Sequence, residues 1–179
     1  PDRLRFDFTH FSQVGIDDLD KIETLVNQHI RENMPTSTRE MDADDAFKSG
    51  ATALFEEKYG DRVRVVSLTD FSKELCGGTH TDRTGNIGLF RIVSESSISS
   101  GIRRIEAVTG EEAVNYTQKT SRILQDTAHL LKEKTTAVPG RVQKMMTSIK
   151  AFEKEVDHLK TKLAAGETDA SKETAKSIN

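Results

Sequence analysis

The sequence has no tryptophan, three prolines and a single cysteine, Cys76, among its 179 residues. One cysteine excludes an internal disulfide framework and suits a reducing compartment, so we expect a cytoplasmic protein. No apolar run approaches the roughly 20 residues that span a bilayer, and the first residues lack the apolar core of a signal peptide. The sequence therefore predicts neither a disulfide-rich secreted domain nor a membrane protein.

A strong positive charge is also absent. The net charge is −3 although 31% of the residues are charged, and the acidic excess lies in residues 1–60. A dedicated nucleic-acid-binding domain usually carries a basic patch or stripe. Any contact with RNA must therefore be local, or be made mainly by parts of a longer protein that are outside this chain.

Two hydrophobic periods divide the first 110 residues. Alternation with period two predicts strands at residues 4–9, 62–68, 87–94 and 102–109. An apolar stripe with helical spacing begins at Ile16 and predicts a helix that ends before Pro35. Between them we expect a short strand at 36–41, a small helix capped by Asp42 and ended by Gly50, and a helical turn at 53–57. The predicted fold class is α+β, with one mixed, largely antiparallel sheet packed by helices.

Strand signals stop after residue 110. Residues 111–134 predict a helix, Pro139 and Gly140 interrupt it, and a second helix follows at 140–164. Its apolar residues step alternately by three and four through three heptads: Val142, Met145, Ile149, Phe152, Val156, Leu159 and Leu163. Such a stripe needs a partner helix, either the preceding helix folded back as a hairpin or a second chain. We expect a partial domain at 1–110, a helical hairpin or coiled-coil arm at 111–165 with possible self-association, and a polar tail or linker at 166–179.

The sharpest chemical feature is the loop Cys76-Gly77-Gly78-Thr79-His80. A thiolate and an imidazole are favoured zinc ligands, and two glycines would let the loop take positive φ angles and leave backbone N–H groups open to a ligand. The alternative is a buried structural cysteine beside a surface histidine. C-x-x-x-H supplies two of the four ligands that zinc usually takes, and His10 is the candidate for a third. Nucleophilic catalysis by a Cys–His pair is disfavoured, because no orienting third group is apparent.

A pair of arginines, Arg103 and Arg104, lies in the last predicted strand and points to opposite faces of it. Arg104 shares a face with Glu106, which suggests a plain surface ion pair. Arg103 shares its face with apolar residues, so its stem would pack while its guanidinium reaches a phosphate or carboxylate. Both are candidates for a contact with tRNA or substrate.

Three segments resemble the alanyl-tRNA synthetase family: RLRFDFTHF at 3–11, GDRVRVVSLTDFSKELCGGTHTDRTGNIGLFRIVSESS at 60–97, and GIRRIEAVTG at 101–110. The resemblance covers nearly all of residues 1–165. It implies the later part of the editing domain followed by the start of the coiled-coil region. The same editing fold occurs in threonyl-tRNA synthetase and in free-standing proteins that deacylate mischarged alanine tRNA.

The resemblance also implies chemistry. In the family an H-x-x-x-H pair and a C-x-x-x-H pair hold zinc; Cys76 and His80 match the second pair, and nothing in the sequence matches the first. Two of four ligands are then present, and the isolated chain is expected to be inactive. The implied parent is an ATP-dependent alanine–tRNA ligase whose ATP site lies outside this chain. The implied local reaction is hydrolysis of Ser-tRNA-Ala and Gly-tRNA-Ala, with catalytic roles for Cys76, Gly77, Gly78 and Thr79.

Two questions stay open at this point. Zinc could either activate a water molecule or grip the amino acid's amine and hydroxyl. The chain could also be a free-standing deacylase of the same fold, or a non-catalytic helical interaction module. The heptad arm and the missing histidine pair count against the free-standing enzyme, and metal content would separate an editing site from an interaction module.

Overall fold

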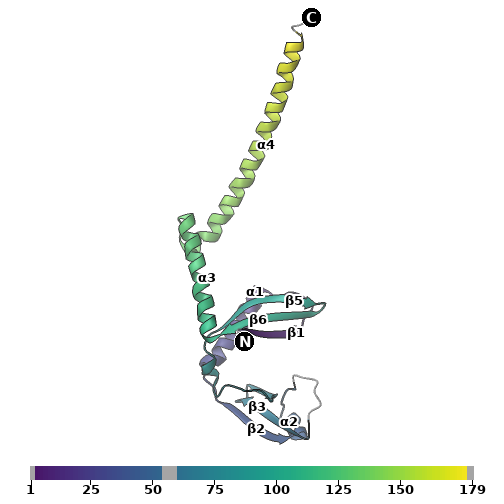
Figure 1. Cartoon of the computed structure of the whole chain (residues 1–179), viewed down its shortest axis with the longest axis vertical. Helices are drawn as coiled ribbons and strands as arrows, with labels where there is room; N and C mark the ends of the chain where they lie inside the picture. The colour runs from purple at the N-terminus through teal and green to yellow at the C-terminus, as the bar shows by residue number, and fades with distance from the viewer. Residues whose placement is uncertain (1–2, 54–59, 177–179) are drawn as a thin grey trace. The chain divides into compact units, whose positions relative to one another are not determined.

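The computed structural model describes residues 3–53 and 60–176, with side chains through residue 163 (Figure 1). The chain divides into two compact units, Pro1–Gln118 and Lys119–Asn179. The first holds two antiparallel sheets with helices, and the second is helical. The predicted α+β class followed by a helical arm is confirmed. No helix among the described residues is long and apolar enough to cross a membrane.

The first sheet is antiparallel, and its strands lie in the order β1 (Leu4–Thr9), β6 (Ile102–Thr109) and β5 (Phe90–Ser99). Helix α1 (Ile16–Arg31) packs on it through a buried cluster formed by Ile30, Phe90 and Ala107. Asn27 ties the helix to β5, because its amide group both donates to Phe90 O at 2.8 Å and accepts from Phe90 N at 3.0 Å. The apolar stripe that predicted α1 is therefore the face that meets the sheet.

The second sheet has the order β2 (Thr36–Asp42), β3 (Arg62–Leu68) and β4 (Ser72–Leu75), again antiparallel. The short helix α2 (Ala43–Lys48) follows β2. Its Ala46 joins Ala51, Val63, Val65 and Leu75 in a separate buried core. The central strand β3 has a neighbouring strand on both sides and is buried at Val63, Val65 and Val66.

One sheet was predicted and two are present, so the grouping of 62–68 with the other strands is wrong. Period-two alternation shows that a segment is a strand, but it does not say which strand is its neighbour. The strand predicted at 87–94 begins later, at Phe90, because Thr84–Ile87 form a 3-10 turn and Gly88 follows with a φ of +73°. Strand β4 was not predicted. The helical turn expected at 53–57 lies outside the described residues.

The helical arm consists of α3 (Gly110–Leu131), a 3-10 turn at Thr135–Ala137, and α4 (Val138–Lys176). Pro139 lies in the first turn of α4, where a proline costs no hydrogen bond. Buried Ala128 and Val138 flank the connection between the helices. Gly166 does not end α4, so the segment expected as a polar tail is helical through Lys176.

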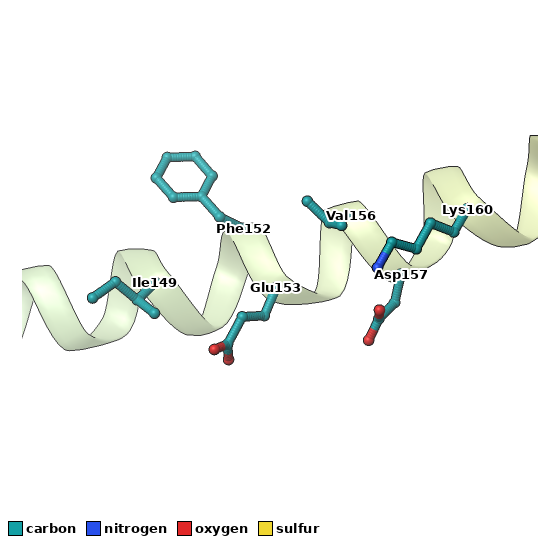
Figure 2. Close-up of a pocket in the computed structure, with 6 residues that line it drawn as sticks. All are labelled: Ile149, Phe152, Glu153, Val156, Asp157 and Lys160. Atoms are coloured by element: carbon teal, nitrogen blue, oxygen red, sulfur yellow. The ribbon is translucent and has the colours of Figure 1, made fainter.

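The predicted helical arm is present, but its heptad stripe is not packed into a hairpin seam. Every residue of the heptad stripe is at least 40% exposed, from Val142 at 40% to Leu163 at 70%, so α3 does not cover it. Figure 2 shows the middle of this face, where Ile149, Phe152 and Val156 project along one side of α4. The periodicity thus specified the helix and its apolar face correctly, but the preceding helix is not what covers that face.

Candidate metal centre

The loop 76–80 starts from a well-fixed strand end. Glu74 pairs with Val66 of β3 on one side and forms a bridge with Thr52 on the other. Leu75 N donates to Thr52 O at 3.0 Å, and Cys76 N donates to Arg64 O at 3.1 Å, which extends the ladder beyond the end of β4. Leu75 is buried in the core of this sheet. Its neighbours Glu74 and Cys76 therefore share the opposite face, because side chains alternate along a strand.

The segment after the loop is anchored as well. Thr36 N at the start of β2 donates to Asp82 O at 2.9 Å. The buried Thr84 hydroxyl donates to His29 O at 2.8 Å and accepts from Met34 N at 2.9 Å. The loop is thus held at one end by β4 and at the other by contacts with the end of α1 and the segment that follows it.

Three potential metal ligands converge here. The donor atoms of Glu74, Cys76 and His80 all lie within 4.8 Å of one another, and each residue is half-buried. Glu74 Oε1 is 3.5 Å from His80 Nε2. A carboxylate, a thiolate and an imidazole are all ligands that zinc takes in proteins, so the residues present fit this ion. The convergence of Cys76 and His80 agrees with the sequence prediction, and Glu74 was missed.

Arg64 and a glycine N–H shape the loop. Arg64 Nη1 donates to Cys76 O at 2.7 Å and to Gly78 O at 2.6 Å. Gly78 N donates to Cys76 Sγ at 3.4 Å, so this N–H is used inside the loop rather than left open. Neither Gly77 nor Gly78 has a positive φ, and that expectation is wrong. The arginine, rather than a left-handed backbone, draws the loop carbonyls together.

The outer side of the loop is accessible. A Cβ built on Gly77 meets nothing within 4 Å, whereas one on Gly78 meets Cys76 Sγ at 3.4 Å. Gly77, Gly78 and Thr79 are all exposed. A ligand can therefore approach the backbone at Gly77 and the hydroxyl of Thr79 without displacing any part of the chain.

His10 and His29 have different surroundings from the loop residues. His10 Nδ1 lies 2.8 Å from Ser12 O, and its ring stacks on Phe11 with centroids 4.9 Å apart. His29 lies 2.8 Å from a carboxylate oxygen of Glu32 and has its ring centroid 3.8 Å from that of Phe71. His10, the candidate third ligand, is not part of the cluster among the described residues.

Arg103 and Arg104 are both held by carboxylates of the first sheet. Arg103 forms a two-pronged pair with Glu95, at 2.5 and 2.6 Å, and the Glu95 side chain is 3% exposed. Arg104 pairs in the same way with Asp7, its cross-strand partner, at 2.7 and 2.8 Å. The hydrogen bonds from these arginines hold the pKa values of both carboxyl groups below their usual range.

The expected Arg104–Glu106 pair is not the one that forms. Glu106 accepts instead from Arg5, its direct partner on β1, at 3.0 Å. That hydrogen bond lowers the pKa of the Glu106 carboxyl. The two arginines therefore link β1 and β5 to β6, and a phosphate would have to compete with carboxylates that already occupy them.

Comparison with known proteins places this geometry in a family. Residues 63–106 match the second additional domain of threonyl and alanyl tRNA synthetases. The whole chain is 53% identical to an alanine–tRNA ligase of Desulfosudis oleivorans over 180 aligned residues. The chain belongs to the alanyl-tRNA synthetase family. It covers 20% of the length of that relative.

The matched domain of this alanyl-tRNA synthetase segment includes β3, β4, the loop 76–80 and β5. The cluster of Glu74, Cys76 and His80 therefore lies entirely within it. The sequence resemblance that carried the prediction is confirmed at the level of the family.

Proposed function

We propose that this chain supplies part of a zinc-dependent editing site in an alanine–tRNA ligase. The site would hydrolyse Ser-tRNA-Ala and Gly-tRNA-Ala, while the parent enzyme ligates alanine to tRNA-Ala with ATP bound outside this chain. The observation that carries the proposal is the convergence of Cys76 and His80 within the segment that matches the synthetase additional domain.

The reaction adds water across an ester. The carbon–oxygen bond between the aminoacyl carbonyl and the terminal ribose breaks, hydroxide joins the carbonyl carbon, and the ribose oxygen leaves with a proton. A bound zinc ion would supply either a water of lowered pKa or a grip on the amino acid. Cys76 and His80 would hold the ion, and Arg64 would keep their loop in shape through its bonds to Cys76 O and Gly78 O.

The exposed part of the loop suits recognition of the amino acid. Thr79 offers a hydroxyl and Gly77 leaves its backbone open. Serine carries a hydroxyl that alanine lacks, and a site that bonds this group rejects the analogue without it by a large factor. A hydrogen bond to the serine hydroxyl would therefore favour hydrolysis of Ser-tRNA-Ala and spare correctly charged alanyl-tRNA. Hydrolysis of Gly-tRNA-Ala would instead depend on the smaller size of glycine.

Zinc removal tests the proposal. We expect the complete enzyme, stripped of zinc by a chelator, to lose hydrolysis of Ser-tRNA-Ala and to regain it when Zn²⁺ is returned. Alanine-dependent ATP–pyrophosphate exchange serves as the control for zinc bound elsewhere and for general damage. Hydrolysis that continues at the untreated rate in metal-free enzyme would refute zinc-dependent editing.

A second role is favoured by the exposed stripe of α4. We propose that a second copy of the chain covers it in a parallel coiled coil. In that register Glu155 of one helix faces Lys160 of the other, at the g and e positions that usually carry interhelical ion pairs. This one pair of opposite charges thus favours a second copy as the partner, and the apolar residues of the stripe form the seam.

Phe152→Asp would place a charge in the centre of this seam. Because Phe152 is 64% exposed in the single chain, we expect little change in monomer stability but a loss of self-association, measured by sedimentation. Thr147→Asp is the matched control, since it adds the same carboxylate at a solvent-facing heptad position. A wild-type chain that stays monomeric at high concentration would refute coverage of the stripe by a second copy.

A further inference from the structure

We infer that Arg83 is a positioning residue for His80, because it forms a latch with Asn33 that fixes the chain just beyond the loop 76–80. The latch is the pair of hydrogen bonds that the Arg83 guanidinium donates to Asn33, in the turn that follows α1. The inference rests on the zinc site of the proposed function, and it states what holds one ligand of that site in place.

The chain crosses the second sheet between Cys76 and Asp82. Cys76 continues β4 on one side of β3, because its N–H donates to the β3 backbone at 3.1 Å. Asp82 lies at the free edge of β2, since its carbonyl accepts from Thr36 N at 2.9 Å and β3 occupies the other side of that strand. His80 lies between these two ends, outside any strand or helix. Its position therefore depends on how firmly the chain is held just after it.

The latch joins two hydrogen-bond acceptors of one residue to one guanidinium. Arg83 Nε donates to Asn33 Oδ1 at 3.1 Å, and Arg83 Nη2 donates to Asn33 O at 2.7 Å. Asn33 has a φ of +50°, a left-handed conformation that asparagine adopts more readily than most residues. A Cβ built on Gly85 would lie 2.5 Å from Asn33 Oδ1, so only glycine leaves room for this side chain. The latch thus depends on particular residue types at three positions.

The latch is close to His80 along the chain. Thr81 Oγ1 donates to Arg83 O at 3.0 Å and closes the short turn between His80 and the latch. Arg83 and Asn33 are both exposed, so replacing either one leaves no cavity in the core. Without the latch, zinc binding through His80 would itself have to order this segment. Affinity should then fall, because freedom lost on binding subtracts from the binding free energy.

The zinc affinity of the complete enzyme, measured by competition with a chromophoric chelator, tests the latch. We expect Arg83→Met and Asn33→Gly each to bind zinc about fivefold more weakly, which corresponds to the net contribution of one hydrogen bond. Glycine keeps the left-handed backbone and removes only the side chain. Asn33→Asp retains an acceptor for Arg83 and should bind as the wild type does. Arg31→Met removes the same charge from the end of α1 and is the matched control.

A double-mutant cycle with His80→Ala shows whether Arg83 acts through His80. Arg83→Met should weaken binding no further once His80 is gone, whereas an additive loss would indicate general stabilisation and refute the inference. Wild-type affinity in Arg83→Met, or an equal loss in Arg31→Met, would also refute it and leave the zinc site standing. If His80→Ala binds zinc as the wild type does, the ion is not held at this loop and the proposed function falls. Circular dichroism of the metal-free variants checks that each is folded.

Discussion

Cys76→Ala in the complete alanine–tRNA ligase is expected to abolish most clearance of Ser-tRNA-Ala while leaving alanine activation intact. Cys76 is the sole thiol in the chain, and its Sγ lies in the donor cluster. Removing it deletes one anionic ligand. Mutating a residue that only supports a metal ligand lowers metal affinity or activity roughly 10–100-fold. Loss of a ligand itself should therefore slow hydrolysis by at least about 100-fold.

Single-turnover hydrolysis of preformed Ser-tRNA-Ala measures this effect directly. ATP–pyrophosphate exchange with alanine, run on the same preparation, should match the wild-type enzyme, because Cys76 lies in the matched additional domain and we propose that ATP binds outside this chain. Wild-type clearance by the Cys76→Ala enzyme would exclude the loop from catalysis. Loss of both activities would instead indicate a folding defect.

Arg64→Met is expected to have the second-largest effect. One guanidinium nitrogen holds the carbonyls of Cys76 and Gly78, at 2.7 and 2.6 Å. Methionine keeps much of the side chain's length and removes both charge-assisted hydrogen bonds. The loop should then lose the geometry that brings Cys76 and His80 together, and zinc affinity should fall by about 10–100-fold.

Two variants make the Arg64 result specific. Arg62→Met removes the same charge from the same strand, where Arg62 makes a loose pair with Asp42 at 3.9 Å, and it should leave zinc affinity unchanged. Arg64→Lys keeps a cation and should restore part of the affinity, because one ammonium group donates with less directional control. Equal affinities of Arg64→Met and Arg62→Met would show that the loop holds its shape without Arg64.

Strand positions were predictable where apolar and polar residues alternate along the sequence. Alternation in 4–9, 62–68 and 102–109 gave the bounds that β1, β3 and β6 have in the structure. The division into two sheets was not predictable, because it depends on pairings between distant segments such as β1 with β6. Strand β4 was missed because its sequence, SKEL, is short and contains one apolar residue.

The same contrast holds within the candidate site. Cys76 and His80 were recognised because a thiol and an imidazole, both favoured zinc ligands, lie close in sequence with three residues between them. Glu74 went unnoticed because its place beside Cys76 follows from β4, which was not predicted. The partners of Arg103 and Arg104 also depend on register, since a carboxylate on another strand becomes a neighbour only after the sheet forms.

Anomalous diffraction at the zinc edge from crystals of the complete, editing-competent enzyme tests the zinc site most directly. The predicted result is a peak about 2.3 Å from Cys76 Sγ and about 2.0–2.1 Å from a ring nitrogen of His80. Enzyme that clears Ser-tRNA-Ala in solution but shows no zinc peak between Cys76 and His80 in its crystals would contradict the metal-centred editing site.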